Sequence, residues 1–213
     1  RHLARVVDYL SRDWSESAHV DEARIGAFGF SAGAHSVLAA AGAETSLDRI
    51  AAHCDAAPDE FVCRSGMAAD VVDAAGAFSA TLPGLRAVVA AAPGFGFGFD
   101  PAQVADLDVA IQLWGAAQDT RVPYDTNIAP LAATLEAPSE AHVVEAAGHF
   151  AFRPPCNPAL EQANPRVWEM ACTDAPEFDR EAFQQRFNRS VVEFLVDNIG
   201  LLGSGPIDRV VSP

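Results

Sequence analysis

Residues 25–35 read Ile-Gly-Ala-Phe-Gly-Phe-Ser31-Ala-Gly33-Ala-His, and this stretch decides how the chain is interpreted. A β-prone apolar run ends in Gly29-Phe-Ser31-Ala-Gly33, and an alanine-rich stretch of helical character follows at once. This is the Gly-x-Ser-x-Gly pattern of a nucleophile elbow, in which a strained strand-to-helix turn projects the serine hydroxyl above a sheet. We expect side chains at Gly29 and Gly33 to collide with the neighbouring strand and helix. The pattern predicts that Ser31 is a nucleophile; the alternative is a Gly-Ser turn that caps a helix.

The bulk composition restricts the classes of partner. The chain has 213 residues, of which 50% are hydrophobic, enough for one domain with a sizeable core. No apolar run approaches the ~18 residues that a membrane span needs. With 29 acidic residues against 14 basic ones, the net charge of −15 argues against nucleic acid or an anionic membrane surface as a partner. The composition leaves the oligomeric state open.

Helical and β-prone segments alternate along the chain, which is typical of an α/β fold with a mostly parallel sheet. The expected helices cover residues 1–13, 32–43, 124–135 and 179–198, and the expected strands cover 24–30, 85–92, 108–114 and 141–145. Residues 46–81 are expected to form a short irregular insertion with helical pieces, and the proline-rich residues 153–177 to be irregular. We expect residues 1–213 to form a single domain that is N-terminally incomplete, because residue 1 already lies inside a helical pattern.

A serine nucleophile needs a base that takes its proton and a carboxylate that orients the base. In chain order, the carboxylate and then the histidine should each follow a later strand. Asp119 lies five residues beyond Trp114, and His149 follows the last expected strand. The carboxyl ends of parallel strands meet at one edge of the sheet, where such folds carry their chemistry. Asp119 and His149 are therefore the predicted partners of Ser31.

Other acidic and histidine residues compete with these two. Asp106 and Asp108 precede a strand and belong at the wrong edge of the sheet, whereas Asp125 resembles a residue in the first turn of a helix. His142 lies at the start or inside of a strand, and His35 is expected to pack under the elbow.

The remaining histidines, His2, His19 and His53, are expected to be surface or capping residues. No group of histidines and acids has metal-ligand spacing, so neither a metal nor a cofactor is expected.

The four cysteines occur as two local pairs, Cys54 with Cys63 and Cys156 with Cys172. Four cysteines allow three connectivities, and proximity in the sequence favours these two pairs. Disulfides would imply an exported, periplasmic or secreted protein. The alternative is that the cysteines are buried free thiols in a cytosolic enzyme.

Several motifs together resemble the α/β-hydrolase superfamily, and within it the bacterial predicted dienelactone hydrolases that are related to platelet-activating-factor acetylhydrolases. The matching pieces are Arg-Ile-Gly-x-x-Gly-Phe-Ser31-Ala-Gly33, Ala-Ala-Pro-Gly94-Phe-Gly, Gly115-x-x-x-Asp119-x-x-Val-Pro123, Gly148-His149-Phe and a terminal Phe-Asp-Arg-x-x-Phe-x-x-x-Phe-Asn helix. The resemblance covers essentially the whole chain but only the C-terminal half to two-thirds of the family's domain. It implies that residues 24–30 correspond to the fifth strand, and that members with both cysteine pairs are typically exported.

Carried over residue by residue, the resemblance makes Ser31 the nucleophile, His149 the general base and then acid, and Asp119 its orienting partner. The backbone N–H of Ala32 would be one oxyanion donor. The second donor should come from the loop after the family's third strand, which has no counterpart here. Dienelactone hydrolases proper use a cysteine nucleophile, so the serine favours ordinary ester hydrolysis.

Four phenylalanines are predicted to line the substrate pocket: Phe30, Phe95, Phe97 and Phe150. Phe95 and Phe97 belong to the Gly94–Phe99 loop, which would border the cleft. The equally weighted alternative is that this loop packs its phenylalanines onto the core. Trp114 is expected in the core.

The sequence therefore predicts a serine carboxylic-ester hydrolase (EC 3.1.1-type) that acts through an acyl-enzyme on short- to medium-chain or acetyl esters. Its expected partner is a small-molecule ester. The alternatives are a catalytically inactive fragment, one piece of a two-part hydrolase and, less favoured, a serine peptidase of the same fold.

Overall fold

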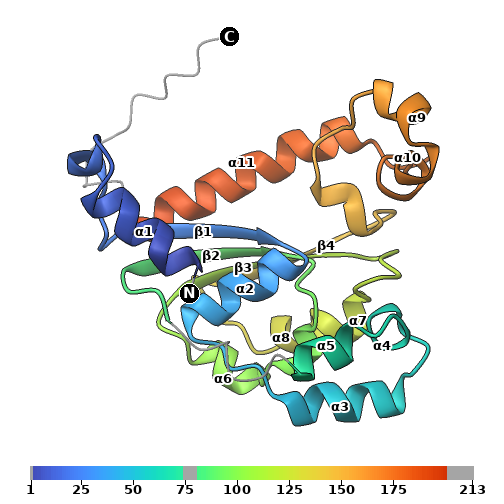
Figure 1. Cartoon of the computed structure of the whole chain (residues 1–213), viewed down its shortest axis with the longest axis horizontal. Helices are drawn as coiled ribbons and strands as arrows, with labels where there is room; N and C mark the ends of the chain where they lie inside the picture. The colour runs from blue at the N-terminus through green and yellow to red at the C-terminus, as the bar shows by residue number, and fades with distance from the viewer. Residues whose placement is uncertain (1, 74–80, 201–213) are drawn as a thin grey trace.

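The computed structural model describes residues 2–73 and 81–200, which include a four-stranded sheet (Figure 1). Its strands are β1 (Ile25–Phe30), β2 (Leu85–Ala91), β3 (Ala110–Ala116) and β4 (Glu140–Val144). They lie in the order β1-β2-β3-β4, and every neighbouring pair is parallel. The loops that follow the strands therefore leave from one edge of the sheet, and the predicted α/β class is confirmed.

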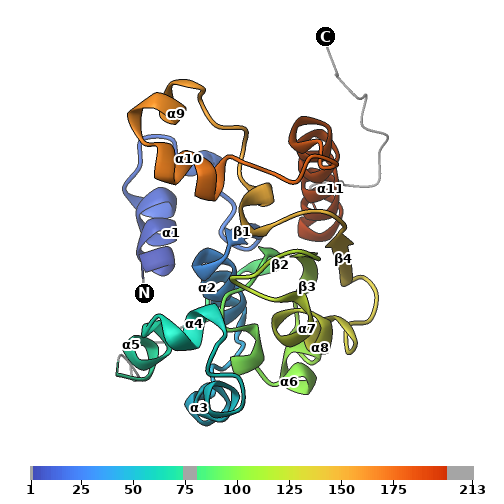
Figure 2. The same ribbon diagram turned by 90° about the vertical axis from the view of Figure 1, so that its right-hand side faces the viewer.

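Helices cover both faces of this sheet. They are α1 (His2–Arg12), α2 (Ala32–Ala41), α3 (Leu47–Ala56), α4 (Phe61–Arg64), α5 (Met67–Asp73), α6 (Pro101–Ala105), α7 (Tyr124–Asn127), α8 (Ala129–Ala132), α9 (Ala159–Ala163), α10 (Pro165–Ala171) and α11 (Arg180–Ile199). Short 3₁₀ turns are η1 (Ser17–His19), η2 (Gly96–Gly98) and η3 (His149–Phe152). Both α2 and α11 contact β1 and β2, and they lie on opposite faces of the sheet (Figure 1, Figure 2).

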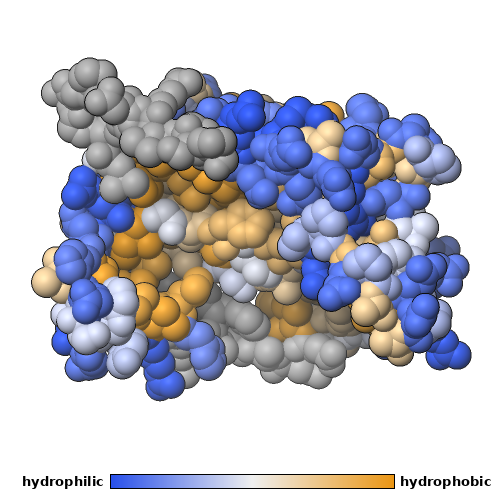
Figure 3. All heavy atoms as spheres, turned by 90° about the horizontal axis from the view of Figure 1, so that it is seen from above, coloured by the Kyte–Doolittle hydropathy of each residue, from blue (hydrophilic) through white to orange (hydrophobic). Residues whose placement is uncertain are grey.

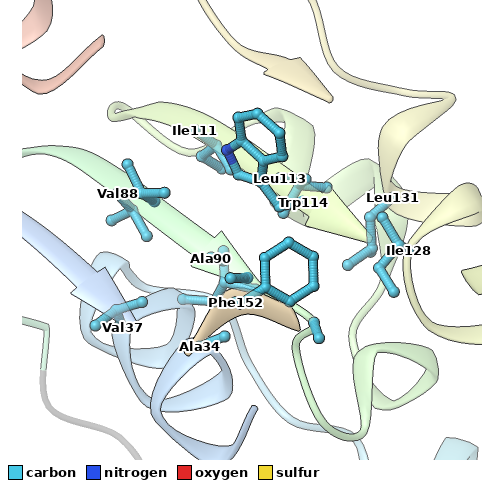
Figure 4. Close-up of a cluster of buried hydrophobic side chains, with 14 of the residues drawn as sticks. Ala34, Val37, Val88, Ala90, Ile111, Leu113, Trp114, Ile128, Leu131 and Phe152 are labelled. Atoms are coloured by element: carbon cyan, nitrogen blue, oxygen red, sulfur yellow. The ribbon is translucent and has the colours of Figure 1, made fainter. Parts of the chain in front are cut away.

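The two central strands form the core. Every residue of β3 is buried, and in β2 only Arg86 is exposed. Such continuous apolar runs are typical of parallel strands that are covered on both faces. Val88 and Leu113 have no exposed surface, and Trp114 is buried in the same core cluster, as predicted (Figure 4). Burying each of these large side chains contributes about 2 kcal/mol.

The edge strands are less covered. Phe28 in the middle of β1 is 46% exposed, and α1 carries the exposed Val6 and Tyr9. Seen from above, apolar atoms gather in the middle of the molecule's face (Figure 3).

The expected helix over residues 124–135 is divided into α7 and α8. Pro130 lies in the first turn of α8. Proline has no N–H to donate to the preceding turn, so a continuous helix through this position would lose a hydrogen bond. The expectation of one helix is therefore wrong at Ile128, where the two helices meet.

Residues 153–177, expected to be irregular, contain the helices α9 and α10. Pro158 immediately precedes α9, and Pro165 is the first residue of α10, whose N-cap Asn164 accepts a hydrogen bond from Val167 N–H. Proline is favoured at the first helical position because that residue's N–H has no partner inside the helix. These prolines begin helices rather than preventing them.

The third strand runs two residues further than expected, to Ala116 instead of Trp114. In the structure a Cβ on Gly115 would overlap the Tyr124 ring, so the glycine lets α7 pack closely against a strand that continues.

Candidate active site

Ser31 occupies a strained turn between β1 and α2. Its backbone angles are φ 55° and ψ −118°, a conformation that costs a non-glycine residue about 1–3 kcal/mol. The turn is held because Ser31 N–H donates to the Ala91 carbonyl at 2.8 Å, and its own carbonyl accepts from His35 N–H at 3.1 Å. The Ser31 side chain makes no capping hydrogen bond to α2. The alternative, in which Ser31 caps the helix through its hydroxyl, is therefore wrong.

The two glycines of the motif have different roles. A Cβ on Gly29 would overlap the backbone carbonyl of Gly33, because the start of α2 lies directly against the end of β1. Gly29 is therefore required for the tight turn, as predicted. At Gly33, a Cβ would meet no described atom within 4 Å. The expected collision at Gly33 is wrong, because a side chain there would point into open space and only the Gly33 backbone approaches Gly29.

The structure brings Ser31, His149 and Asp119 together in hydrogen-bonding order. His149 Nε2 lies 3.1 Å from Ser31 Oγ, and His149 Nδ1 lies 2.7 Å from Asp119 Oδ2. The side chains of His149 and Asp119 are 8% and 0% exposed. An Nδ1–H that donates to the carboxylate leaves Nε2 as the acceptor for the serine proton, which is the tautomer that a general base needs.

Asp119 is fixed by its own loop. Its second carboxylate oxygen, Oδ1, accepts hydrogen bonds from the N–H groups of Arg121 and Val122, each at 2.8 Å. These two bonds fix the carboxylate plane, so Oδ2 stays directed at the imidazole.

The competing acids and histidine lie elsewhere. Asp106 ends α6 and Asp108 lies before β3, at the opposite end of that strand from Asp119, whereas Asp125 lies in the first turn of α7. His142 lies within β4, where its ring stacks on Trp114 at 4.1 Å between centroids.

The loop that carries His149 is held by the first turns of α11. Arg180 Nη1 donates to the Phe150 carbonyl at 2.9 Å, and Gln184 Nε2 donates to the Ala151 carbonyl at 2.7 Å. Arg180 is buried and also binds both carboxylate oxygens of Asp174, at 2.6 and 2.7 Å. These supports were not predicted. The sequence did carry a signal for them: Arg180 and Gln184 lie four positions apart, at the start of an otherwise apolar helix face.

The loop after β2 is held against the elbow by His35. Its Nδ1 lies 2.9 Å from the Gly94 carbonyl and its Nε2 lies 2.9 Å from Thr45 Oγ1, while Gly94 N–H donates to Ser31 O at 3.2 Å. Burial lowers the pKa of His35, and the Gly94 carbonyl opposes that shift. The prediction that His35 packs under the elbow is confirmed.

A second anchor of this loop is Asn127, which sequence reasoning did not identify. It is 1% exposed, and its Oδ1 accepts from Gly96 N–H at 3.0 Å. A Cβ on Gly96 would overlap the Asn127 carbonyl, so the loop and α7 touch through their backbones.

Ala32, the predicted oxyanion donor, is the first residue of α2 and is exposed. The first N–H groups of a helix have no partner within it, and the described backbone hydrogen bonds do not use Ala32 N–H. Among the described hydrogen bonds, this N–H next to Ser31 therefore remains without an acceptor.

The predicted pocket phenylalanines fall into two groups. The Phe30 and Phe150 rings lie 4.9 and 5.1 Å from the His149 ring, and Phe150 also lines a cavity of about 200 Å³ with His149. Phe97 is only 8% exposed and packs with Phe95 in a cluster formed mainly by α3–α5. Phe95 and Phe97 therefore pack their loop onto a hydrophobic cluster, which was the alternative to lining the pocket.

His53 is also part of that cluster, although it was expected at the surface or in a cap. Its ring stacks on Phe97 at 3.7 Å between centroids, and its Nε2 lies 3.1 Å from Glu60 Oε2. Its side chain is 15% exposed, because α3 turns it inward against the loop after β2.

All four cysteines form disulfides, in the pairing that sequence proximity favoured. Cys54–Cys63 joins α3 to α4, and Cys156–Cys172 joins the segment before α9 to the end of α10. The alternative, that the four cysteines are free thiols, is therefore wrong for this structure.

Two further findings concern the described residues only. They contain no cluster of three or more His, Cys, Asp or Glu side chains arranged to hold a metal ion. None of their helices is both long and apolar enough to span a membrane.

No protein-family model and no curated protein matches the chain. Among solved structures, it is similar to a carboxylesterase from Lactobacillus plantarum WCFS1, with 18% identity and a TM-score of 0.51 over 95% of this chain and 68% of that one. It also matches an acetyl ester-xyloside bifunctional hydrolase from Caldicellulosiruptor lactoaceticus (17% identity, TM-score 0.38, 90% of this chain and 64% of that one). A third match is an acylaminoacyl peptidase from Pyrococcus horikoshii (12% identity, TM-score 0.38, 85% of this chain and 29% of that one). The first likeness, with the four parallel strands and flanking helices, shows a partial α/β-hydrolase fold.

Proposed function

We propose that the chain hydrolyses carboxylic esters, with Ser31 as nucleophile, His149 as general base and then acid, and Asp119 as the group that orients His149. The observation that carries this proposal is the continuous hydrogen-bond chain from Ser31 Oγ to His149 to Asp119, at 3.1 and 2.7 Å. Buried apolar surroundings strengthen such a chain, because water cannot compete for its members.

In the first half of the reaction, Ser31 Oγ attacks the ester carbonyl carbon while His149 Nε2 accepts the hydroxyl proton. The developing oxyanion is stabilised by the Ala32 N–H at the start of α2, a donor worth about 3 kcal/mol in comparable sites. His149 then gives its proton to the departing alkoxide, which leaves as an alcohol, while the acyl group stays bonded to Ser31 Oγ as an ester.

In the second half, His149 takes a proton from water as the water attacks the acyl-enzyme. Collapse of the second oxyanion releases the carboxylic acid and returns the proton to Ser31 Oγ. Asp119 stays ionised and stabilises the imidazolium in both halves. No cofactor takes part in this scheme.

The substrates we propose are short- to medium-chain or acetyl esters, because phenyl rings surround His149 and the adjoining cavity is small. The sequence motifs support a subfamily related to the predicted dienelactone hydrolases and platelet-activating-factor acetylhydrolases. The two disulfides support a periplasmic or secreted location, since such bonds persist in oxidising compartments.

The test is covalent labelling by a fluorophosphonate probe, followed by hydrolysis of para-nitrophenyl acetate. We expect stoichiometric labelling of the wild-type chain, and Ser31→Ala should abolish both labelling and hydrolysis while the chain stays folded. His149→Ala should lower the labelling rate by a factor of about 10³ or more. A folded chain that takes up no probe would refute the proposal and favour the inactive-fragment alternative.

A further inference from the structure

Arg121 lies two residues beyond Asp119, and its half-buried guanidinium is held between two aromatic rings. The guanidinium carbon is 4.4 Å from the centroid of Phe61 in α4 and 5.3 Å from that of Phe150. Each such cation–π contact contributes about 0.5–2 kcal/mol and restricts where the cation can lie. Because Phe150 follows His149 directly, the charge is fixed close to the predicted base.

This charge has no acidic partner in the described part of the chain. Arg121 takes part in none of the described ion pairs, and its guanidinium makes none of the described hydrogen bonds. The nearby acid Asp174 is already bound through both oxygens to Arg180. A guanidinium has five N–H donors in one plane, so Arg121 retains the donors that a ligand could use.

The same side chain lines the cavity of about 200 Å³ beside His149. Thr120, Thr173 and Phe150 also line it. Asp174 lies in the same wall, where its charge is paired with that of Arg180. At roughly 30 Å³ per water molecule, the space holds a group of a few heavy atoms rather than a long chain. A polar wall, a fixed cation and a small volume together fit a small anionic group.

We propose that Arg121 binds a carboxylate carried by the substrate, so that the preferred substrates are esters with a free carboxylate on the acyl or the alcohol part. Planar guanidinium and carboxylate groups pair through two parallel N–H···O bonds, which fixes the orientation of the ligand. In a chain of net charge −15, an anionic substrate needs such a local cation to offset long-range repulsion. This inference rests on the proposed ester hydrolysis at Ser31.

The test compares esters that differ only in charge. On the acyl side, the para-nitrophenyl hemiester of glutaric acid is compared with para-nitrophenyl valerate; on the alcohol side, para-acetoxybenzoate is compared with para-acetoxybenzamide. We expect the ratio of kcat/KM for the charged and neutral esters in at least one pair to fall about tenfold or more in Arg121→Gln, mostly through KM. Arg121→Lys should retain part of the ratio, and high salt should lower it in the wild type.

Arg64→Gln is the matched control. It removes a positive charge from α4, as Arg121→Gln removes one from the loop after β3. The exposed Arg64 guanidinium lies 6.0 Å from the Phe61 ring, which Arg121 also contacts. Arg64 does not line the cavity. The Arg64→Gln ratio should equal that of the wild type. An Arg121→Gln ratio equal to the wild type in both pairs would overturn the proposal, as would an equal fall in both arginine variants.

A direct binding measurement separates this inference from the catalytic proposal. If no ester is hydrolysed and no probe is bound, the proposed function fails, and calorimetry with glutarate then decides the role of Arg121. Binding to Ser31→Ala that is lost in Ser31→Ala/Arg121→Gln supports a carboxylate site. Absence of glutarate binding to Ser31→Ala overturns it.

Discussion

The loops around Ser31 and the helical segment α3–α5 (Leu47–Asp73) are stabilised by different means. Around Ser31, buried side chains bind backbone groups: Arg180 and Gln184 hold the His149 loop, and Asn127 holds the loop after β2. In the helical segment, the described core is a small cluster that includes Ile50 and Phe97, together with the Cys54–Cys63 disulfide.

This difference indicates which region sets the geometry of the triad. Every described hydrogen bond of His149 and Asp119 is made within the sheet-edge loops, and none comes from the helical segment. Among the described contacts, the segment reaches these loops through the Phe61 ring, which contacts Arg121, and through Arg49 Nε, which donates to the Phe97 carbonyl at 3.3 Å. Substitutions in the sheet-edge loops should therefore change both the stability and the activity of the chain. Substitutions in the helical segment should mainly change local stability.

The largest effect should come from Gly29→Ala, which breaks the sheet-edge region at its tightest point. Its Cβ would overlap the Gly33 carbonyl, so β1 and α2 must separate and Ser31 must move. We expect a loss of several kcal/mol of unfolding free energy, and labelling by a fluorophosphonate should fall at least a hundredfold. Urea unfolding and labelling kinetics measure the two effects.

Gly33→Ala is the control for that variant, because its Cβ meets no described atom within 4 Å. It should change stability by less than about 1 kcal/mol and leave the fold of the elbow intact. Equal damage from both substitutions would contradict the packing described here.

Arg180→Met should have the next largest effect. It removes the cation that binds Asp174 and the Phe150 carbonyl, leaving a partly buried carboxylate unpaired. Breaking such a pair costs about 3–5 kcal/mol, and the His149 loop should loosen as well. Thermal unfolding and the pH–rate profile check the prediction; a double variant with Asp174→Asn should recover part of the stability.

Replacing both Cys54 and Cys63 by serine should have a smaller effect, confined to the helical segment. The disulfide closes a short loop with a sequence separation of 9, so its removal should cost about 2–3 kcal/mol or less. We expect faster amide exchange in α3 and α4, with hydrolysis of small neutral esters reduced less than threefold. Loss of the triad's activity in this variant would show that the segment supports the sheet-edge loops after all.

The smallest effect should be a pH dependence of stability from His35. Burial lowers its folded pKa below the ordinary 6.5, so the unfolded chain binds the proton first as the pH falls. The contribution of His35 to the free energy of unfolding is therefore complete above about pH 6.5. Below that pH it decreases by at most about 1.4 kcal/mol per pH unit, until the folded pKa is reached. His35→Asn, which can still donate to the Gly94 carbonyl, should show a flatter curve in urea unfolding at several pH values.

The triad residues could be identified from the sequence because each is tied to a local pattern. Ser31 lies in a five-residue motif, and Asp119 and His149 each follow a β-prone run at a fixed place in chain order. A parallel sheet then brings such strand ends to one edge without further information. The catalytic roles themselves, and the assignment of residues 1–213 to a single domain, stay predictions.

The remaining features depend on contacts between distant segments. Nothing local to Gln184 or Asn127 indicates which backbone loop each one binds, since the partners lie 33 and 31 residues away. The error at Gly33 has the same origin, because sequence shows that a glycine is present but not which atoms approach it. Helix ends at prolines were also misjudged, because Pro165 begins a helix and Pro130 interrupts one.

The sequence separation between Ser31 and His149 has a consequence for the order in which this protein matures. The 3.1 Å contact joins residues 118 positions apart, and it requires β2, β3 and β4 to be paired in register first. Nonlocal pairings of this kind form late, because loop-closure entropy must be overcome before they contribute. While the chain is being made, Ser31 therefore lacks its contact with His149. We predict that the reactivity proposed for Ser31 arises only after β4 has paired with β3.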